Sequence, residues 1–181
     1  MIHIKKITYD DILPMWTKYM PNMSLEPTSA MSCFLIHVKN EKTYKFEFID
    51  HYDLENQKFT PTFWGAFDNE KLIGVNSGHM TLDRMYRSRG LYVNKDYRGR
   101  GIGQKLLMKT TSQGYHENAI AIWSYPKHDS WSTYGYVGFR QSGHTFNFEW
   151  EQSGESFNTK SVVVLDEEAL YQLDTPQHQT P

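Results

Sequence analysis

Three glycines interrupt the stretch LYVNKDYRGRGIGQKLL, residues 91–107, where an alternating apolar run gives way to a helix-like run. The glycines are Gly99, Gly101 and Gly103, and the basic residues around them are Arg98, Arg100 and Lys105. A helix that begins here presents unsatisfied backbone N–H groups and the positive end of its dipole. Glycines leave room for an anion to approach those groups, and the basic side chains add positive charge. The turn therefore resembles a cradle for a pyrophosphate group.

Two well-known phosphate-binding turns do not fit this stretch. The dinucleotide-binding fingerprint requires G-x-G-x-x-G, whereas the turn reads G-x-G-x-G. The P-loop requires Lys and then Ser or Thr directly after its last glycine, but Gly103 is followed by Gln104. A different kind of cradle remains, as does the simpler reading of a glycine-rich turn with solvated arginines.

The segments around the turn predict a strand–helix–strand unit. MYRSRGLYV, residues 85–93, and AIAIWSY, residues 119–125, each predict a strand. Between them, IGQKLLMKTTSQGYHEN predicts an amphipathic helix with Gly114 near its end. The predicted buried stripe of that helix is Ile102, Leu106, Leu107 and Thr110.

Further elements are expected on both sides of this unit. Asp10 and Asp11 are typical of a helix start, and Pro14 is tolerable only in the first turn of that helix. The remaining predicted elements are a strand at 2–8, antiparallel strands at 63–68 and 71–82 joined by a turn at 68–70, a short helix at 128–137, and closing strands at 139–152 and 156–166.

The length of 181 residues suits one domain with a sizeable core. Residues 31–62 give a weak periodic signal, in which KTYKFEFIDHYDL, residues 42–54, alternates like the arm of a hairpin. The last segment, QLDTPQHQTP, is polar and contains proline, as frayed termini do. We expect a single domain over 1–173 and a flexible tail over 174–181.

The charge balance argues against nucleic acid and anionic membrane as partners. The chain has 19 Lys and Arg against 21 Asp and Glu, with a formal net charge of −2. It therefore lacks the overall basic field that recruits such partners. RNA binding through the RGRG stretch is opposed by the same balance.

The single cysteine, Cys33, cannot form an intrachain disulfide, and no cysteine–histidine cluster has the spacing of a zinc site. We therefore expect a reducing, cytoplasmic setting and no metal. The amino-terminal sequence MIHIKKITYDDI lacks the continuous apolar core of a signal peptide, and no window reaches membrane-spanning length.

The glycine turn resembles the acyl-CoA-binding motif of the GNAT acetyltransferase superfamily, (Gln/Arg)-x-x-Gly-x-(Gly/Ala), which Arg98, Gly101 and Gly103 match. The preceding strand in that family commonly ends Val-x-Pro-x-Tyr-Arg. Val93 and Tyr97 match this pattern, whereas Lys95 replaces the proline.

A second segment strengthens the resemblance. GNAT members typically carry Asn-x-x-Ala-x-x-Leu-Tyr-x-x-x-Gly-Phe after the fifth strand, and Tyr134, Gly138 and Phe139 stand at that spacing. The departures are Lys127 for Asn, Ser130 for Ala and Thr133 for Leu. The resemblance is specific over residues 64–140.

The resemblance implies an α/β fold with a mixed, mostly antiparallel sheet, flanked by helices and splayed where the coenzyme binds. It implies an acetyl-CoA-dependent N-acetyltransferase, with backbone groups of the splayed strand binding the pantetheine arm and an N–H near Tyr92 or Val93 polarising the thioester carbonyl. The implied coenzyme-binding residues are Leu91, Tyr92, Val93, Arg98, Gly99, Arg100, Gly101, Ile102, Gly103, Gln104 and Ser130.

Acyl transfer also needs an acid for the departing thiolate. Tyr134 is the candidate, because a phenol of ordinary pKa about 10 can donate to a thiolate whose ordinary pKa is about 8.5. The alternative is a tyrosine that only packs. Its spacing to Gly138 and Phe139 favours the catalytic reading.

The general base is less clear from the sequence. Many GNAT members carry a glutamate on the strand before the turn, but MYRSRGLYV has none, and the aligned position, near Ser88, cannot act as a base. His79 on the preceding strand is the candidate, against the alternatives of a hydrogen-bonded strand histidine or a water relay.

The acceptor amine is not readable from the sequence. Arginines and tryptophans that could line its pocket, or equally be surface and core residues, are Arg84, Arg87, Arg89, Trp16, Trp64, Trp123 and Trp131. Polyamine, amino acid, antibiotic and protein amino groups all remain, and a homodimer is left open. The competing hypothesis is a non-catalytic acyl-CoA-binding sensor or assembly module, motivated by the missing glutamate.

Overall fold

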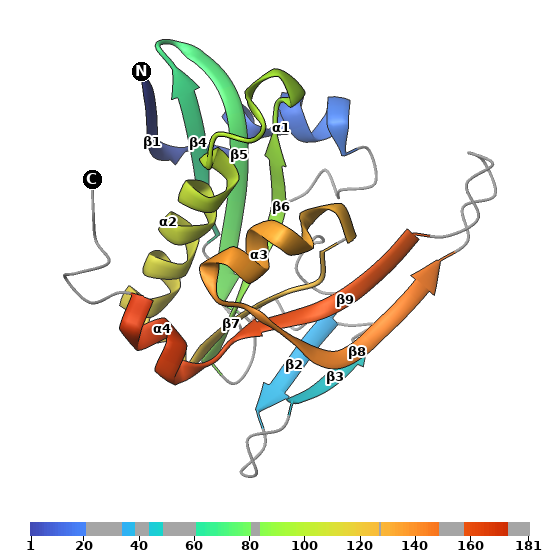
Figure 1. Ribbon diagram of the computed structural model, residues 1–181. Coiled ribbons are helices and arrows are strands. Elements are labelled where there is room, and N and C mark those ends of the chain that lie inside the picture. The colour runs from blue at the N-terminus through green and yellow to red at the C-terminus, as the bar shows by residue number, and fades with distance from the viewer. Residues whose placement is uncertain are drawn as a thin grey trace.

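The computed structural model describes residues 1–20, 34–38, 44–48, 61–80, 84–126, 128–148 and 158–173. Its main feature is a seven-stranded mixed sheet of order β1-β4-β5-β6-β7-β9-β8 (Figure 1). The strands are β1 (Ile2–Ile7), β4 (Thr62–Asp68), β5 (Lys71–Met80), β6 (Met85–Val93), β7 (Ala121–Ser124), β9 (Asn158–Leu165) and β8 (Arg140–Phe148). Adjacent strands are antiparallel except β6 and β7, which are parallel. A separate antiparallel pair is formed by β2 (Phe34–Val38) and β3 (Tyr44–Phe48).

Helices lie on both faces of the seven-stranded sheet. On one face are α2 (Ile102–His116), α3 (Trp131–Val137) and α4 (Glu167–Leu173), and on the other is α1 (Tyr9–Tyr19) (Figure 1). Short 3-10 helices, η3 (Lys95–Tyr97) and η4 (His128–Ser130), precede α2 and α3. Within these described ranges, no helix combines the length and apolar character needed to cross a membrane.

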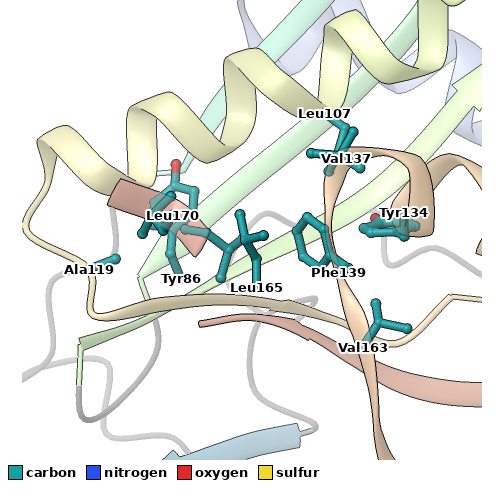
Figure 2. Close-up of a cluster of buried hydrophobic side chains, with 10 residues drawn as sticks. Tyr86, Leu107, Ala119, Tyr134, Val137, Phe139, Val163, Leu165 and Leu170 are labelled. Atoms are coloured by element: carbon teal, nitrogen blue, oxygen red, sulfur yellow. The ribbon is translucent and has the colours of Figure 1, made fainter. Parts of the chain in front are cut away.

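The core follows the apolar stripe of α2. Ile102 and Leu106 pack over β4 and β5 with Trp64 and Ile73. Leu107 joins a second cluster that links β6, β7, α3 and α4 (Figure 2). On the opposite face, Ile12 and Trp16 of α1 pack on Phe63 and Val75.

Most elements expected from the sequence are confirmed. The strand at 85–93 has the predicted bounds, α2 carries the predicted buried stripe, and the hairpin of β4 and β5 turns at Asn69. Within the hairpin arm predicted at 42–54, Tyr44–Phe48 form β3, whereas residues 42–43 and 49–54 lie outside the described residues. The mixed, mostly antiparallel α/β class is confirmed as well.

Two sequence expectations are wrong. Pro14 lies in the second turn of α1, because the helix begins earlier, at a capping box in which Thr8 and Asp11 bond to each other's backbone N–H groups. The polar segment 172–181 does not begin as a frayed tail, because its first two residues, Gln172 and Leu173, are the last residues of α4. The tail expected at 174–181 lies outside the described residues.

The helix α4 was missed by the sequence analysis. Asp166 caps it, because its carboxylate accepts from the N–H of Ala169 at 3.1 Å and its carbonyl from that of Leu170 at 2.8 Å. The sequence DEEAL, with an N-cap aspartate before two glutamates, carried the signal for this helix start.

Candidate active site

The sheet opens between its two parallel strands. β6 and β7 pair over Met85–Arg87 and Ala121–Trp123, after which β6 continues to Val93 while β7 ends at Ser124. The part of β6 beyond Arg87 therefore has an edge that β7 does not cover. The expected splay is confirmed at this point, and we call the place where the two strands part the apex.

Two serines and a tyrosine meet at the apex. Ser88 follows the last paired residue of β6, and Ser124 follows the last paired residue of β7. The Ser124 hydroxyl lies 2.7 Å from the Ser88 carbonyl oxygen and 2.9 Å from the Tyr134 hydroxyl. The Ser88 hydroxyl is also 2.9 Å from the Tyr134 hydroxyl. Side-chain hydroxyls thus occupy the position where the backbone pairing of β6 with β7 ends.

The hydroxyl group of Ser88 is connected to α2 through a buried asparagine. Asn76 Nδ2 of β5 donates to Ser88 Oγ and to Thr110 Oγ1, both at 2.9 Å. Thr110 Oγ1 in turn donates to the carbonyl of Leu106 at 3.0 Å. Three neighbouring strands, α2 and α3 are therefore joined by one buried polar chain.

Tyr134 is held on all sides in this position. The residue is 1% exposed, and its ring meets that of Phe139 edge to face at 5.0 Å between centroids (Figure 2). Burial raises the pKa of the Tyr134 phenol above its ordinary value, while the hydrogen bonds with Ser124 and Ser88 oppose that rise. The phenol is thus protonated at neutral pH, as a proton donor must be.

A β-bulge lies farther along the open edge of β6. Val75 pairs with Tyr92 and Ser77 with Arg89, so β6 has one more residue than β5 between these pairs. Gly90 in the bulge has a φ of 82°, and a Cβ on it would lie 2.4 Å from the indole of Trp16. Glycine is therefore required both by the conformation and by the space.

Trp16 of α1 also fixes the orientation of the bulge. Its Nε1–H donates to the Gly90 carbonyl at 2.9 Å. Because a peptide group is planar and trans, the N–H of Leu91 points away from that carbonyl and hence away from α1. A helix on one face of the sheet thus sets where a backbone donor on β6 is aimed.

The glycine turn forms an open amino end for α2. Gly99 and Gly101 have φ values of 79° and 75°, and Gly101 is the N-cap of the helix. An added Cβ at Gly99 would meet no atom of the described residues within 4 Å, and one at Gly101 would meet Gln104 Oε1 at 3.5 Å. Among the described residues, therefore, nothing crowds the backbone at either position, as the approach of an anion requires.

Gly103 lies against neighbouring elements as well as in the turn. An added Cβ there would lie 3.4 Å from Thr133 Cγ2 and 3.6 Å from Val93 Cγ2. These are ordinary van der Waals distances, so an alanine would also fit here, between the first turn of α2, α3 and the end of β6. Gly103 acts as a packing residue as well as a member of the turn.

The two arginines of the glycine turn fold back on their own segment. Arg98 donates from Nε to the Val93 carbonyl at 3.0 Å and lies 5.5 Å from the ring centroid of Tyr92. Arg100 lies 5.2 Å from the ring centroid of Tyr97. Both side chains are exposed, so their positive charge remains at the mouth of the turn.

The candidate base, His79, is on the opposite face of β5 from Tyr134. Its neighbour Gly78 faces Tyr86 and Thr110, and successive strand residues point to opposite faces. His79 is 2% exposed, and burial, followed by the charges of Arg87 and Arg89, holds its pKa well below the ordinary value. The imidazole is therefore neutral at pH 7, which is the form a base requires.

The remaining predicted residues divide between the site and the core. Arg87 stacks 4.8 Å from the ring centroid of Trp123 near His79, whereas Arg84 is exposed and donates to the Asn118 carbonyl in a turn. Trp64 is a core residue under α2. The sequence had left it, together with Trp16, among the residues that could line the acceptor pocket. Trp131 donates to the Pro126 carbonyl, and Ser130 is the residue before α3.

Comparison of the sequence with protein families decides the assignment. The profile of the acetyltransferase (GNAT) family matches residues 31–139, which is more than half of the chain. The chain belongs to the GNAT family. The resemblance seen in the glycine turn and around Tyr134 is thereby confirmed.

Solved structures share the GNAT fold with this chain at low sequence identity. An IAA acetyltransferase from Bacillus cereus is 15% identical, with a TM-score of 0.62, over 92% of this chain and 99% of its own. The ribosomal-protein-S18-alanine N-acetyltransferase of Escherichia coli is 12% identical, with a TM-score of 0.61, over 92% and 94%. A Bacillus anthracis acetyltransferase solved with acetyl coenzyme A is 14% identical, with a TM-score of 0.56, over 92% and 99%. No curated protein matches the sequence significantly.

Three features of this GNAT chain were not predicted from its sequence. They are the apex partner Ser124, the buried Asn76–Thr110 link and the contact of Trp16 with Gly90. Each joins residues from different elements, so local spacing carried no signal for it. Gly90, a glycine inside a predicted strand, was the one local hint, since such a glycine often marks a bulge.

Proposed function

We propose that this GNAT acetyltransferase moves an acetyl group from acetyl-CoA to a primary amine at the opening between β6 and β7. The observation that carries the proposal is the Tyr134 hydroxyl at the apex, buried and hydrogen-bonded to Ser88 and Ser124. A proton donor at the apex, where β6 and β7 part, suits a reaction whose leaving group is a thiolate.

The coenzyme would be held by the turn and by the free edge of β6. The amino end of α2, opened by Gly99 and Gly101, suits the pyrophosphate, and Arg98 and Arg100 add positive charge at its mouth. Residues Leu91, Tyr92 and Val93 offer backbone groups along the edge that β7 does not cover. Ile102, Gly103, Gln104 and Ser130 complete the proposed contact set, the last from the start of α3.

The thioester carbonyl needs a donor as it gains negative charge. We assign this role to a backbone N–H in the segment from Leu91 to Val93, which begins in the bulge. The contact of Trp16 with the Gly90 carbonyl supports this assignment, because it turns the next N–H away from α1. A donor fixed in this way needs no reorganisation when charge develops.

The departing thiolate would take its proton from Tyr134. The attacking amine must be neutral, and His79, held neutral by burial and by its arginine neighbours, could take up the proton that it loses. His79 and Tyr134 lie on opposite faces, so a single substrate reaches both only through the opening of the sheet. A water relay is the alternative to His79.

The acceptor class, the cytoplasmic setting and a homodimer stay predictions of the sequence. The alternative function is an acyl-CoA-binding sensor, favoured by the absence from MYRSRGLYV of the glutamate that many members carry on the strand before the turn. Release of free CoA thiol from acetyl-CoA with a panel of polyamines, amino acids, aminoglycosides and peptide amines separates the two. Turnover with any acceptor excludes the sensor-only function, whereas binding without turnover across the panel supports it.

A further inference from the structure

We infer that Ser124 is a positioning residue that holds the Tyr134 proton before transfer and stabilises the phenolate formed when that proton leaves. The inference deepens the proposed function and rests on it. Ser124 is 4% exposed and ends β7, one residue past the last pair with β6. Its hydrogen bonds among the described residues go to the Tyr134 hydroxyl and the Ser88 carbonyl, and to none of the proposed coenzyme residues.

The direction of the hydrogen bonds on the Ser88 side follows from groups that can only accept or only donate. The Leu106 carbonyl only accepts, so Thr110 donates to it at 3.0 Å and is left to accept from Asn76 Nδ2. The second hydrogen of the same Nδ2 goes to Ser88 Oγ at 2.9 Å. The proton of Ser88 is therefore directed to the Tyr134 oxygen, 2.9 Å away.

The Ser124 side has one proton and two acceptors within reach. The Ser88 carbonyl is 2.7 Å from Ser124 Oγ, and the Tyr134 oxygen is 2.9 Å from it. While Ser124 donates to the carbonyl, its own oxygen can accept the Tyr134 proton. When it turns to Tyr134, the phenol oxygen gains a second donor.

The two orientations of the Ser124 hydroxyl match the two protonation states of Tyr134, the phenol and the phenolate. In the transfer step the Tyr134 O–H bond breaks and an S–H bond forms on the leaving thiolate, so the electron pair of the O–H bond stays on the phenol oxygen. Ser88 already donates to that oxygen, and Ser124 can rotate its O–H from the carbonyl to it with no movement of a heavy atom. The phenolate then regains, through His79 or the water relay, the proton that the attacking amine loses.

A kinetic cycle separates this role from packing. Ser124→Ala should lower kcat by about 10- to 100-fold, the value of a hydrogen bond to a charged group, with unchanged affinity for CoA. In the Tyr134→Phe background the same change should have less than a two-fold effect, since its target is gone. Ser124→Thr keeps a hydroxyl and should recover most of the activity. Equal losses in both backgrounds would overturn the inference.

A second measurement needs no acceptor. In protein labelled with [13Cζ]tyrosine, the Tyr134 resonance is assigned by its disappearance in Tyr134→Phe, and it should move in Ser124→Ala. Ser77→Ala is the matched control, because this serine is also 4% exposed and donates to a backbone carbonyl, that of Arg89 at 2.6 Å. The Tyr134 resonance should stay in place in that variant.

The two measurements fail in different ways. A parent protein that acetylates no amine and binds no acetyl-CoA contradicts the proposed function, while the resonance still decides whether Ser124 sets the Tyr134 hydroxyl. A Tyr134 resonance unchanged by Ser124→Ala contradicts the inference even in an active enzyme. A moved resonance with parental kcat contradicts it as well.

Discussion

At the scale of the residue, Tyr134 unites a motif position with an unusual environment. Its ring packs as a core tyrosine does, while its hydroxyl is placed between two serines at the apex of the open strands. The packing and catalytic interpretations of the sequence are therefore compatible. What separates them is the consequence of removing the oxygen alone.

Tyr134→Phe keeps the packing ring and removes the proton donor. Affinity for acetyl-CoA should change little, because the hydroxyl is proposed to serve the leaving group and not to hold the coenzyme. Turnover should fall by about 10²–10⁴-fold, as for other general acids. A melting curve reports separately on the lost hydrogen bonds, worth about 1 kcal/mol each. Turnover within two-fold of the parent would assign Tyr134 to packing alone.

The sequence could locate Tyr134 but not its partners. The spacing to Gly138 and Phe139 lies within one helix and its cap, so it is visible as a motif. Ser88 and Ser124 are 46 and 10 residues away from Tyr134 and belong to two different strands. Only the parallel pairing of β6 with β7 brings these two serines together.

At the scale of the element, α2 begins where the glycine turn opens space for an anion. Gly101→Asp should abolish coenzyme binding, because the side chain fills that space and adds a negative charge at the helix end. Gly101→Asn is the matched control, since Asn has the same shape, no charge and tolerance of the left-handed conformation at φ 75°.

The readout for these variants is the rise in melting temperature caused by acetyl-CoA. We expect the parent to be stabilised, Gly101→Asn to be stabilised less, and Gly101→Asp not to be stabilised while remaining folded without coenzyme. An unchanged coenzyme effect in folded Gly101→Asp would place the phosphates elsewhere.

The helix α1 tolerates a proline in its second turn at a cost. Pro14 is exposed and lacks the N–H that would bond within the helix, whereas Ile12 and Trp16 anchor the helix on the sheet. Pro14→Ala should stabilise the protein by about 1–2 kcal/mol, the restored helix geometry outweighing the gain in unfolded-state entropy. Pro14→Gly should give less, because glycine is a poorer helix former. Chemical denaturation measures both, and a destabilised Pro14→Ala would show that the ring itself packs.

Elements were predictable where the periodic signal was strong. The stripe of α2 and the alternation of β5 and β6 gave correct elements because burial on one face imposes that pattern. Pro14 was misplaced because the cap at Thr8 moved the helix start, and α4 was missed because its seven residues give too short a pattern. In both cases a side-chain cap sets the residue at which the helix begins, and a cap leaves no trace in the hydrophobic periodicity.

At the scale of the whole molecule, burying His79 links stability to pH. Its folded pKa lies well below 6.5, so an unfolded chain binds a proton there that the folded chain does not. The sign is therefore that stability is full above about pH 6.5 and falls by about 1.4 kcal/mol per pH unit below it, until the folded pKa is reached. His79→Gln should remove the contribution of His79 to the pH dependence of the free energy of unfolding. Urea unfolding at a series of pH values measures that dependence. A slope unchanged by His79→Gln would contradict this link.

The strand order of the whole sheet, more than any single motif, brings the parts of the site together. The order β1-β4-β5-β6-β7-β9-β8 places the turn, the bulge and Tyr134 around one opening, although they are spread over some 45 residues of sequence from Gly90 to Tyr134. The acceptor could not be predicted, because its pocket depends on contacts between distant side chains and not on a spacing.

The central claim is that the opening between β6 and β7, with the glycine turn beside it, binds acetyl-CoA. Isothermal titration calorimetry of the full chain with acetyl-CoA tests it most directly. We predict saturable binding of one acetyl-CoA per chain, retained in Tyr134→Phe and lost in Gly101→Asp. No binding heat from the folded parent at millimolar acetyl-CoA would contradict the claim.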